Sequence, residues 1–72
     1  MPRLPRVTAK EIITVLEKRG FFFMRQSGSH KVLRHPDGRQ TYVALHPGAL
    51  PIGTFRKILK QAALTEEQFR AL

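Results

Sequence analysis

Apolar and polar residues recur along the chain with two different periods, and the first is helical. In residues 9–19 the apolar side chains return every three or four positions, which places them on one side of a helix. Thr8 can cap the start of this helix, with Glu11 three positions later completing a capping box, and Gly20 suits its end. The pattern therefore predicts a helix here whose apolar side packs into the core.

The second period, in the middle of the chain, is that of β-strands. A short aromatic run opens residues 21–26, and alternation of apolar and polar residues follows in 29–35 and 40–45. Turn-forming residues separate these segments at 27–28 and 36–39. Because both connections are too short for a crossover, the three segments are predicted to form an antiparallel meander.

Three consecutive phenylalanines open the first of these strands. Phe21, Phe22 and Phe23 cannot all point to the same side of a strand, so at least one lies on the second face of the sheet. Two interpretations remain open. This face is a partner surface, or the short N-terminal arm, residues 1–6, covers it.

Helical spacing returns after residue 50. The apolar stripe of this second helix consists of Phe55, Ile58, Leu59 and Ala62. We expect Thr54 to cap its start. After Leu64 breaks the period, residues 65–68 repeat the capping-box pattern, which predicts a short C-terminal helix through Phe69.

The resulting order, α-β-β-β-α with a short C-terminal helix, belongs to the α+β class with a three-stranded antiparallel sheet. Seventy-two residues suffice for one small domain, and we expect a single domain over residues 1–72. The chain has no cysteine, which excludes disulfides and thiolate metal sites. It also has no apolar run near the roughly 20 residues of a membrane span. We therefore expect a soluble, cytoplasmic protein.

Charge narrows the choice of partner. Thirteen Lys and Arg against five acidic residues give a formal net charge of +8. Such an imbalance indicates nucleic acid, an acidic protein or an anionic membrane surface as the partner, or serves solubility alone.

The strongest candidate for chemistry is His30, which follows a glycine turn at the start of the second strand. An unperturbed imidazole, with a pKa of about 6.5, both takes and gives a proton near neutrality. Lys31 follows it directly, and Arg25 and Arg34 lie close along the predicted strands. This surrounding positive charge favours an anionic substrate.

Several short motifs, in order and closely spaced, resemble those of the HicA (YcfA-like) family of toxins from toxin–antitoxin pairs. The matching motifs are Leu4-Pro5, Leu16 through Gly20-Phe21, Gly28-Ser29-His30, His35-Pro36-Asp37-Gly38-Arg39, His46, Gly53-Thr54-Phe55 and Ile58 through Ala62. Two departures are Ala44-Leu45 before His46, where the family commonly has proline with a basic or polar residue, and Ala63, where glycine often ends the helix.

The resemblance implies a fold like that of a double-stranded-RNA-binding domain, with both helices on one face of the sheet. It also implies an mRNA-cleaving ribonuclease that blocks translation, uses no metal or other cofactor and is neutralised by a HicB-like antitoxin. The family's functional histidine corresponds to His30.

RNA carries its own nucleophile, the 2′-hydroxyl, so a ribonuclease mainly needs proton transfer and cations around the phosphate. We expect His30 to act as general base or general acid, with charge stabilised by nearby donors. His46 is either a second proton-transfer group, a phosphate contact or a turn histidine, and His35 is expected to be structural. The residues expected to contact RNA are Gly28, Ser29, Lys31, Arg34, His46, Arg56, Lys57 and Lys60. The histidines are too dispersed along the chain to predict a metal site.

Two other functions fit the same residues. A small basic α/β domain can hold structured RNA without cutting it, and would then bind a transcript without turnover. An interaction protein whose phenylalanine face and positive charge serve only an acidic partner would show no salt-sensitive affinity for RNA.

Overall fold

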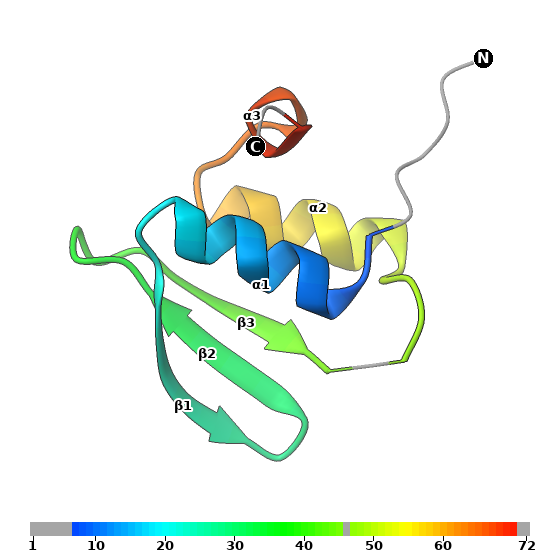
Figure 1. Ribbon diagram of the computed structural model, residues 1–72, viewed down its shortest axis with the longest axis horizontal. Coiled ribbons are helices and arrows are strands. Elements are labelled where there is room, and N and C mark those ends of the chain that lie inside the picture. Colours follow the sequence, from blue (N-terminus) through cyan, green and yellow to red (C-terminus); the bar gives the residue numbers. More distant parts are fainter. Residues whose placement is uncertain (1–6, 46, 71–72) are drawn as a thin grey trace.

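A computed structural model describes residues 7–45 and 47–70 of the chain. The elements are, in order, α1 (Ala9–Lys18), β1 (Phe22–Ser27), β2 (His30–Arg34), β3 (Gln40–Ala44), α2 (Ile52–Gln61) and α3 (Glu66–Arg70). The predicted α+β order is confirmed. Figure 1 shows α1 and α2 next to β3, with β1 farthest from the helices and α3 on the side of the helices away from the sheet. Within the described residues, no helix is long and apolar enough to cross a membrane.

Helix α1 begins and ends as its sequence predicts. The Glu11 backbone N–H donates to Thr8 Oγ1, and the Thr8 N–H donates to Glu11 Oε1, both at 3.2 Å, so the capping box is complete. At the other end Gly20 adopts φ +94°, and the Phe21 N–H donates to the Leu16 carbonyl at 3.0 Å. This left-handed residue satisfies the last carbonyls of the helix and turns the chain toward β1.

Helix α2 begins earlier than predicted. Its first residue is Ile52, and Pro51 stands at the N-cap without a side-chain hydrogen bond. The prediction that Thr54 caps the helix is therefore wrong. Proline lacks the N–H that would go unsatisfied at a helix start, and its extended backbone (φ −56°, ψ 142°) suits an N-cap residue, so the helix can begin directly after it. Thr54 lies inside the first turn, where its side chain is available for another purpose.

The C-terminal end of α2 repeats the geometry of α1 with a less suitable residue. The Leu64 N–H donates to the Leu59 carbonyl at 2.9 Å, and the Ala63 N–H donates to the Lys60 carbonyl at 3.1 Å. Ala63 has φ +56° and is the sole non-glycine residue with positive φ in the described part of the chain. An L-residue in this conformation costs about 1–2 kcal/mol through its Cβ.

Replacing Ala63 with glycine should therefore stabilise the protein, by about 0.5–1 kcal/mol after the larger chain entropy of glycine is subtracted. Urea denaturation of the parent and variant measures the difference. Gly20→Ala is the matched opposite, since a Cβ there would lie 2.9 Å from His35 Nε2 in addition to the φ penalty, and we expect it to destabilise. Equal stability of Ala63→Gly and the parent would contradict this reading of the helix end.

The sheet has the order β1-β2-β3 with both pairs antiparallel. Gly28, at φ +58°, allows the tight turn between β1 and β2. A bulge between Phe23 and Arg25 shifts the register of β1 by one residue, and beyond it Ser27 pairs with His30. The register places on one face, called here the His30 face, the residues Phe22, Arg25, Ser27, His30, Val32, Arg34, Gln40, Tyr42 and Ala44.

The opposite face of the sheet carries the main core. Leu33 and Val43 from this face pack with Ile12 and Leu16 of α1 and with Phe55 of α2, all fully or almost fully buried. Helix α2 lies along β3, and Thr41 Oγ1 donates to Gln61 Oε1 at 2.7 Å. Because α2 packs beside β3, one side of this helix also borders the His30 face.

Strand β1 contributes no buried residue to this core. Of the three phenylalanines, Phe21 is buried just before the strand, whereas Phe22 and Phe23 are 44% and 51% exposed on opposite faces. The prediction that they divide between the two faces is confirmed. The N-terminal arm that was considered as a cover, residues 1–6, lies outside the described residues.

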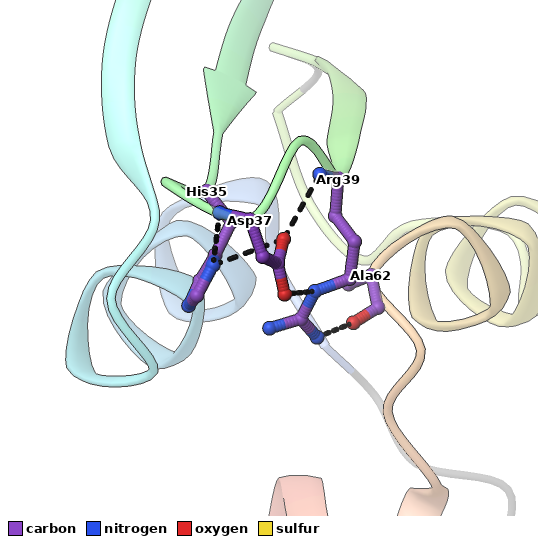
Figure 2. Close-up of polar contacts among 4 residues, drawn as sticks. All are labelled: His35, Asp37, Arg39 and Ala62. Atoms are coloured by element: carbon purple, nitrogen blue, oxygen red, sulfur yellow. Dashed lines mark hydrogen bonds and ion pairs between the residues drawn. The ribbon is translucent and has the colours of Figure 1, made fainter.

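The turn between β2 and β3 is tied to the end of α2, as Figure 2 shows. Arg39 Nη1 donates to the Ala62 carbonyl, and Arg39 Nε lies 2.8 Å from Asp37 Oδ2. Hydrogen bonds from Arg39 lower the pKa of the Asp37 carboxyl below its usual value, and the bond from the Arg39 backbone N–H has the largest effect. The arginine thereby places a positive charge at the C-terminal end of α2, where it interacts favourably with the helix dipole.

His35 belongs to the same turn. Its Nδ1 accepts the Asp37 N–H at 3.1 Å, and the same nitrogen lies 3.0 Å from Asp37 Oδ1. The ring meets Phe21 edge to face, with the centroids 5.2 Å apart. These contacts give His35 a packing role, as predicted.

Candidate functional site

His30 is the first residue of β2 and follows directly on the turn at Gly28 and Ser29. Its backbone is held on both sides, because it pairs with Ser27 of β1 and with Ala44 of β3. Its side chain is exposed. The central strand therefore fixes the backbone position of His30, while its imidazole stays accessible to solvent and substrate.

An open hollow of about 530 Å³ lies where the His30 face of the sheet meets α2. The side chains around it come from all three strands and from one side of α2. They are Arg25, Ser27, His30, Val32, Tyr42, Ala44, Thr54, Lys57, Ile58 and Gln61. Thr54, which does not cap α2, belongs to this lining.

The hollow is cationic. Arg25 and Lys57 border it together with His30, and no carboxylate is among its described lining residues. Ser27, Thr54 and Tyr42 add hydroxyl groups, which donate or accept hydrogen bonds. Chemically, the arrangement can hold an anionic group beside an imidazole that transfers protons.

The other predicted residues of strand β2 and its turn are divided between the faces of the sheet. Gly28 and Ser29 form the turn beside His30, where the Ser29 carbonyl accepts the Leu45 N–H at 2.6 Å. Arg34 is exposed on the His30 face at the far end of the strand. Lys31 lies on the opposite face, borders a separate hollow against α1 and has its Nζ 5.6 Å from the Phe23 ring centroid. Lys31 is therefore not placed beside His30.

The three cations predicted on α2 also separate. Lys57 borders the His30 hollow, whereas Arg56 and Lys60 border a different depression with Leu64 and Glu66. Arg56 Nε lies 3.3 Å from Glu66 Oε1, so part of its charge is already paired. Successive helix residues point about 100° apart, and the packing of α2 against β3 turns the Lys57 side toward His30.

His46, the remaining predicted contact, lies outside the described residues. Within residues 7–45 and 47–70 there is no group of three histidine or acidic side chains placed to hold a metal ion. Sequence reasoning missed four polar lining residues of the hollow, Ser27, Tyr42, Thr54 and Gln61. Alternation along β3 could have indicated Tyr42, since it shares a face with Val32, its partner in the register.

Comparison with known proteins adds the family. A search of curated proteins finds no match. The family model of the HicA toxin of bacterial toxin–antitoxin systems matches residues 9–64. That match spans α1, the whole sheet and α2, and includes every described side chain that lines the His30 hollow. A chain matched over this share of its length is a family member, and the protein belongs to the HicA toxins of bacterial toxin–antitoxin systems.

Proposed function

We propose that this toxin is a metal-independent endoribonuclease that cleaves mRNA, with His30 as the group that transfers protons. The supporting observation is the hollow in which His30 lies with two cations, Arg25 and Lys57, and without a described carboxylate. A phosphodiester fits this combination, since cations bind its charge and the imidazole serves the adjacent hydroxyl. Membership of the HicA family identifies the protein as a toxin, and cleavage of mRNA is the proposed cause of its toxicity.

In the proposed reaction the 2′-oxygen of RNA forms a bond to the scissile phosphorus while the bond from phosphorus to the 5′-oxygen breaks. His30 accepts the proton of the 2′-hydroxyl as general base while water protonates the leaving 5′-oxygen, or it protonates the 5′-oxygen as general acid while water takes the 2′-proton. Lys57 and Arg25 stabilise the additional negative charge on the phosphorane oxygens. The products are a 2′,3′-cyclic phosphate and a free 5′-hydroxyl, so atoms and charge balance.

The remaining basic residues have a supporting role in this proposal. Arg34 extends the positive charge along the His30 face, and Arg56, Lys60 and Lys31 add charge on other surfaces. Contacts to phosphate position a nucleic acid without reading its bases. We therefore expect weak dependence of binding on RNA sequence and strong dependence on salt.

In the cell, mRNA cleavage would stop translation and growth, and a cognate HicB-like antitoxin would prevent it. A positively charged toxin favours an acidic partner surface, which speeds association and opposes binding of basic proteins. With mRNA and the antitoxin as its partners, the protein would act in the cytoplasm.

Incubation of a labelled transcript with purified toxin in EDTA tests the central claim. Cleavage in EDTA is expected, with products that carry cyclic phosphate. A protein that binds the transcript with salt-sensitive affinity but never cuts it would instead support the alternative function, a basic RNA-binding module of the same fold.

Lys57 and Lys60 provide a matched pair for the role of the hollow. Both are exposed on α2, and both lose the same charge on replacement by alanine, but Lys57 alone of the two borders the hollow. Lys57→Ala should lower kcat/KM roughly tenfold, which corresponds to about 1.4 kcal/mol of lost phosphate interaction. It should also reduce the log–log salt slope of single-stranded RNA binding by about 0.7.

Lys60→Ala should have a clearly smaller effect on kcat/KM. Equal losses in the two variants would show that the whole basic surface, and not the hollow, holds the substrate. Thermal unfolding of both variants checks that neither change acts through the fold.

A further inference from the structure

The His30 face carries two exposed aromatic side chains that the fold does not explain. Tyr42 on β3 is 47% exposed, and Phe22 on β1 is 44% exposed. Neither packs into the buried cluster that holds the sheet to the helices. Tyr42 borders the hollow with His30, and its hydroxyl is held by Gln40 Nε2 at 2.7 Å. Its ring is therefore oriented although it is open to solvent.

Register places the two rings along one path from the imidazole. Tyr42 pairs with Val32 and is a diagonal neighbour of His30 across the β2–β3 ladder, a separation of roughly 7–8 Å between Cα atoms. Phe22 pairs with Arg34 on the far side of β2, on the same face. A strand of RNA with its scissile phosphate at His30 would pass these rings as it crosses the sheet.

Cations lie beside the aromatic residues, Arg25 and Arg34 on this face and Lys57 on the bordering side of α2. Arg25, Arg34 and Lys57 are exposed, and no acidic residue occurs in β1, β2 or β3. Exposed rings interleaved with positive charge are the usual features of single-stranded nucleic-acid binding, because each base has a flat face to stack and each linkage a negative charge to neutralise. A duplex offers no free base faces, since its bases already stack on one another.

We propose that Tyr42 and Phe22 form a base-stacking platform that selects unpaired RNA, with Tyr42 holding a base next to the scissile phosphate. The position of this base next to a scissile phosphate rests on the proposed function, whereas binding of unpaired bases by the platform does not require cleavage. The platform makes single-stranded RNA the substrate class, although the order of elements resembles that of a double-stranded-RNA-binding domain. The alternation of rings and cations, in place of a continuous apolar patch, favours RNA over a protein partner.

The chain contains one tyrosine and no tryptophan, so its tyrosine emission reports on Tyr42 alone. The probe is an RNA oligonucleotide with 2′-O-methyl groups, which lacks the nucleophile and cannot be cleaved. Titration with this single strand should quench the emission, because a stacked base contacts the ring. The same strand annealed to its complement, at matched absorbance, should quench much less. Equal quenching by the duplex, or by polyglutamate of similar charge, would overturn the inference.

Substitutions test the platform independently of fluorescence. Tyr42→Ala and Phe22→Ala should each weaken single-strand binding by about 5- to 150-fold, the range that corresponds to loss of one stacked base. Tyr42→Phe keeps the ring and should bind nearly as the parent does. Phe23→Ala is the matched control, because Phe23 is the adjacent exposed phenylalanine on the opposite face of β1.

A Phe23→Ala loss as large as that of Phe22→Ala, or parental binding by Tyr42→Ala, would overturn the platform. Cleavage of the unmodified strand is followed in parallel. Quenching without cleavage would support the platform while removing the nuclease, whereas parental cleavage by Tyr42→Ala would overturn the platform while leaving the nuclease. Circular dichroism of each variant confirms that it is folded.

Discussion

Replacing His30 with alanine is expected to reduce RNA cleavage by about 10²–10⁴-fold, the usual contribution of one positioned general acid or base. The imidazole is the one described histidine that borders the cationic hollow, since His35 is engaged in the turn after β2. Single-turnover cleavage of a labelled transcript in EDTA measures the loss. Binding of the uncleavable strand should change much less, because the phosphate contacts of Lys57 and Arg25 remain.

The His30→Ala protein should also keep its stability. His30 is exposed and does not belong to the buried cluster, so removing its ring leaves no cavity. Inducible expression of the parent and the variant extends the test to cells, where the parent should stop growth and degrade mRNA and the variant should do neither. Parental cleavage by a folded His30→Ala protein would remove the proposed mechanism.

Replacing Arg39 with alanine is expected to lower the free energy of unfolding by about 2 kcal/mol, the largest stability effect we predict. Its guanidinium bonds the Ala62 carbonyl at the end of α2, and its Cζ lies 5.2 Å from the Phe21 ring centroid. A charged hydrogen bond of this kind contributes about 1.5–3 kcal/mol. The partly exposed ion pair with Asp37 adds little. Urea denaturation with a two-state fit measures the change.

Arg39→Lys distinguishes shape from charge in this contact. A lysine has one ammonium group, which cannot bond Asp37 and the Ala62 carbonyl in the fixed geometry of a guanidinium fork. We expect it to recover less than half of the lost stability. Full recovery would show that the charge near the helix end, and not the pair of directed hydrogen bonds, stabilises this turn.

Asp37 gives the same contact a dependence on pH. Because the folded state lowers the pKa of its carboxyl, the ionised form stabilises the fold at and above the ordinary carboxyl range. This contribution is lost as the pH falls through the lowered pKa. It should be missing in Asp37→Asn, whose stability at neutral pH should lie between those of the parent and Arg39→Ala.

Local patterns in the chain were enough to predict α1, the three strands, their turns and α3. Each of these depends on neighbours within a few positions: the capping box at Thr8, the left-handed glycines at 20 and 28, and the alternation of β2. Such signals act over distances that sequence spacing describes directly. The start of α2 was predicted too late, at Thr54, because Pro51, three residues earlier, also suits a helix start although its side chain makes no capping hydrogen bond.

Which side chains meet at the candidate site was settled by long-range packing. Lys57 and Lys60 are equivalent in an isolated helix, and they separate because α2 lies against β3 with one particular side. Tyr42 reaches the His30 hollow because the register of β3 on β2 brings it there, from twelve positions away in the chain. The helical and strand periods set the angle between neighbouring side chains within one element. The docking of one element on another, driven by burial of Leu33, Val43 and Phe55, decides which side of each element faces the site.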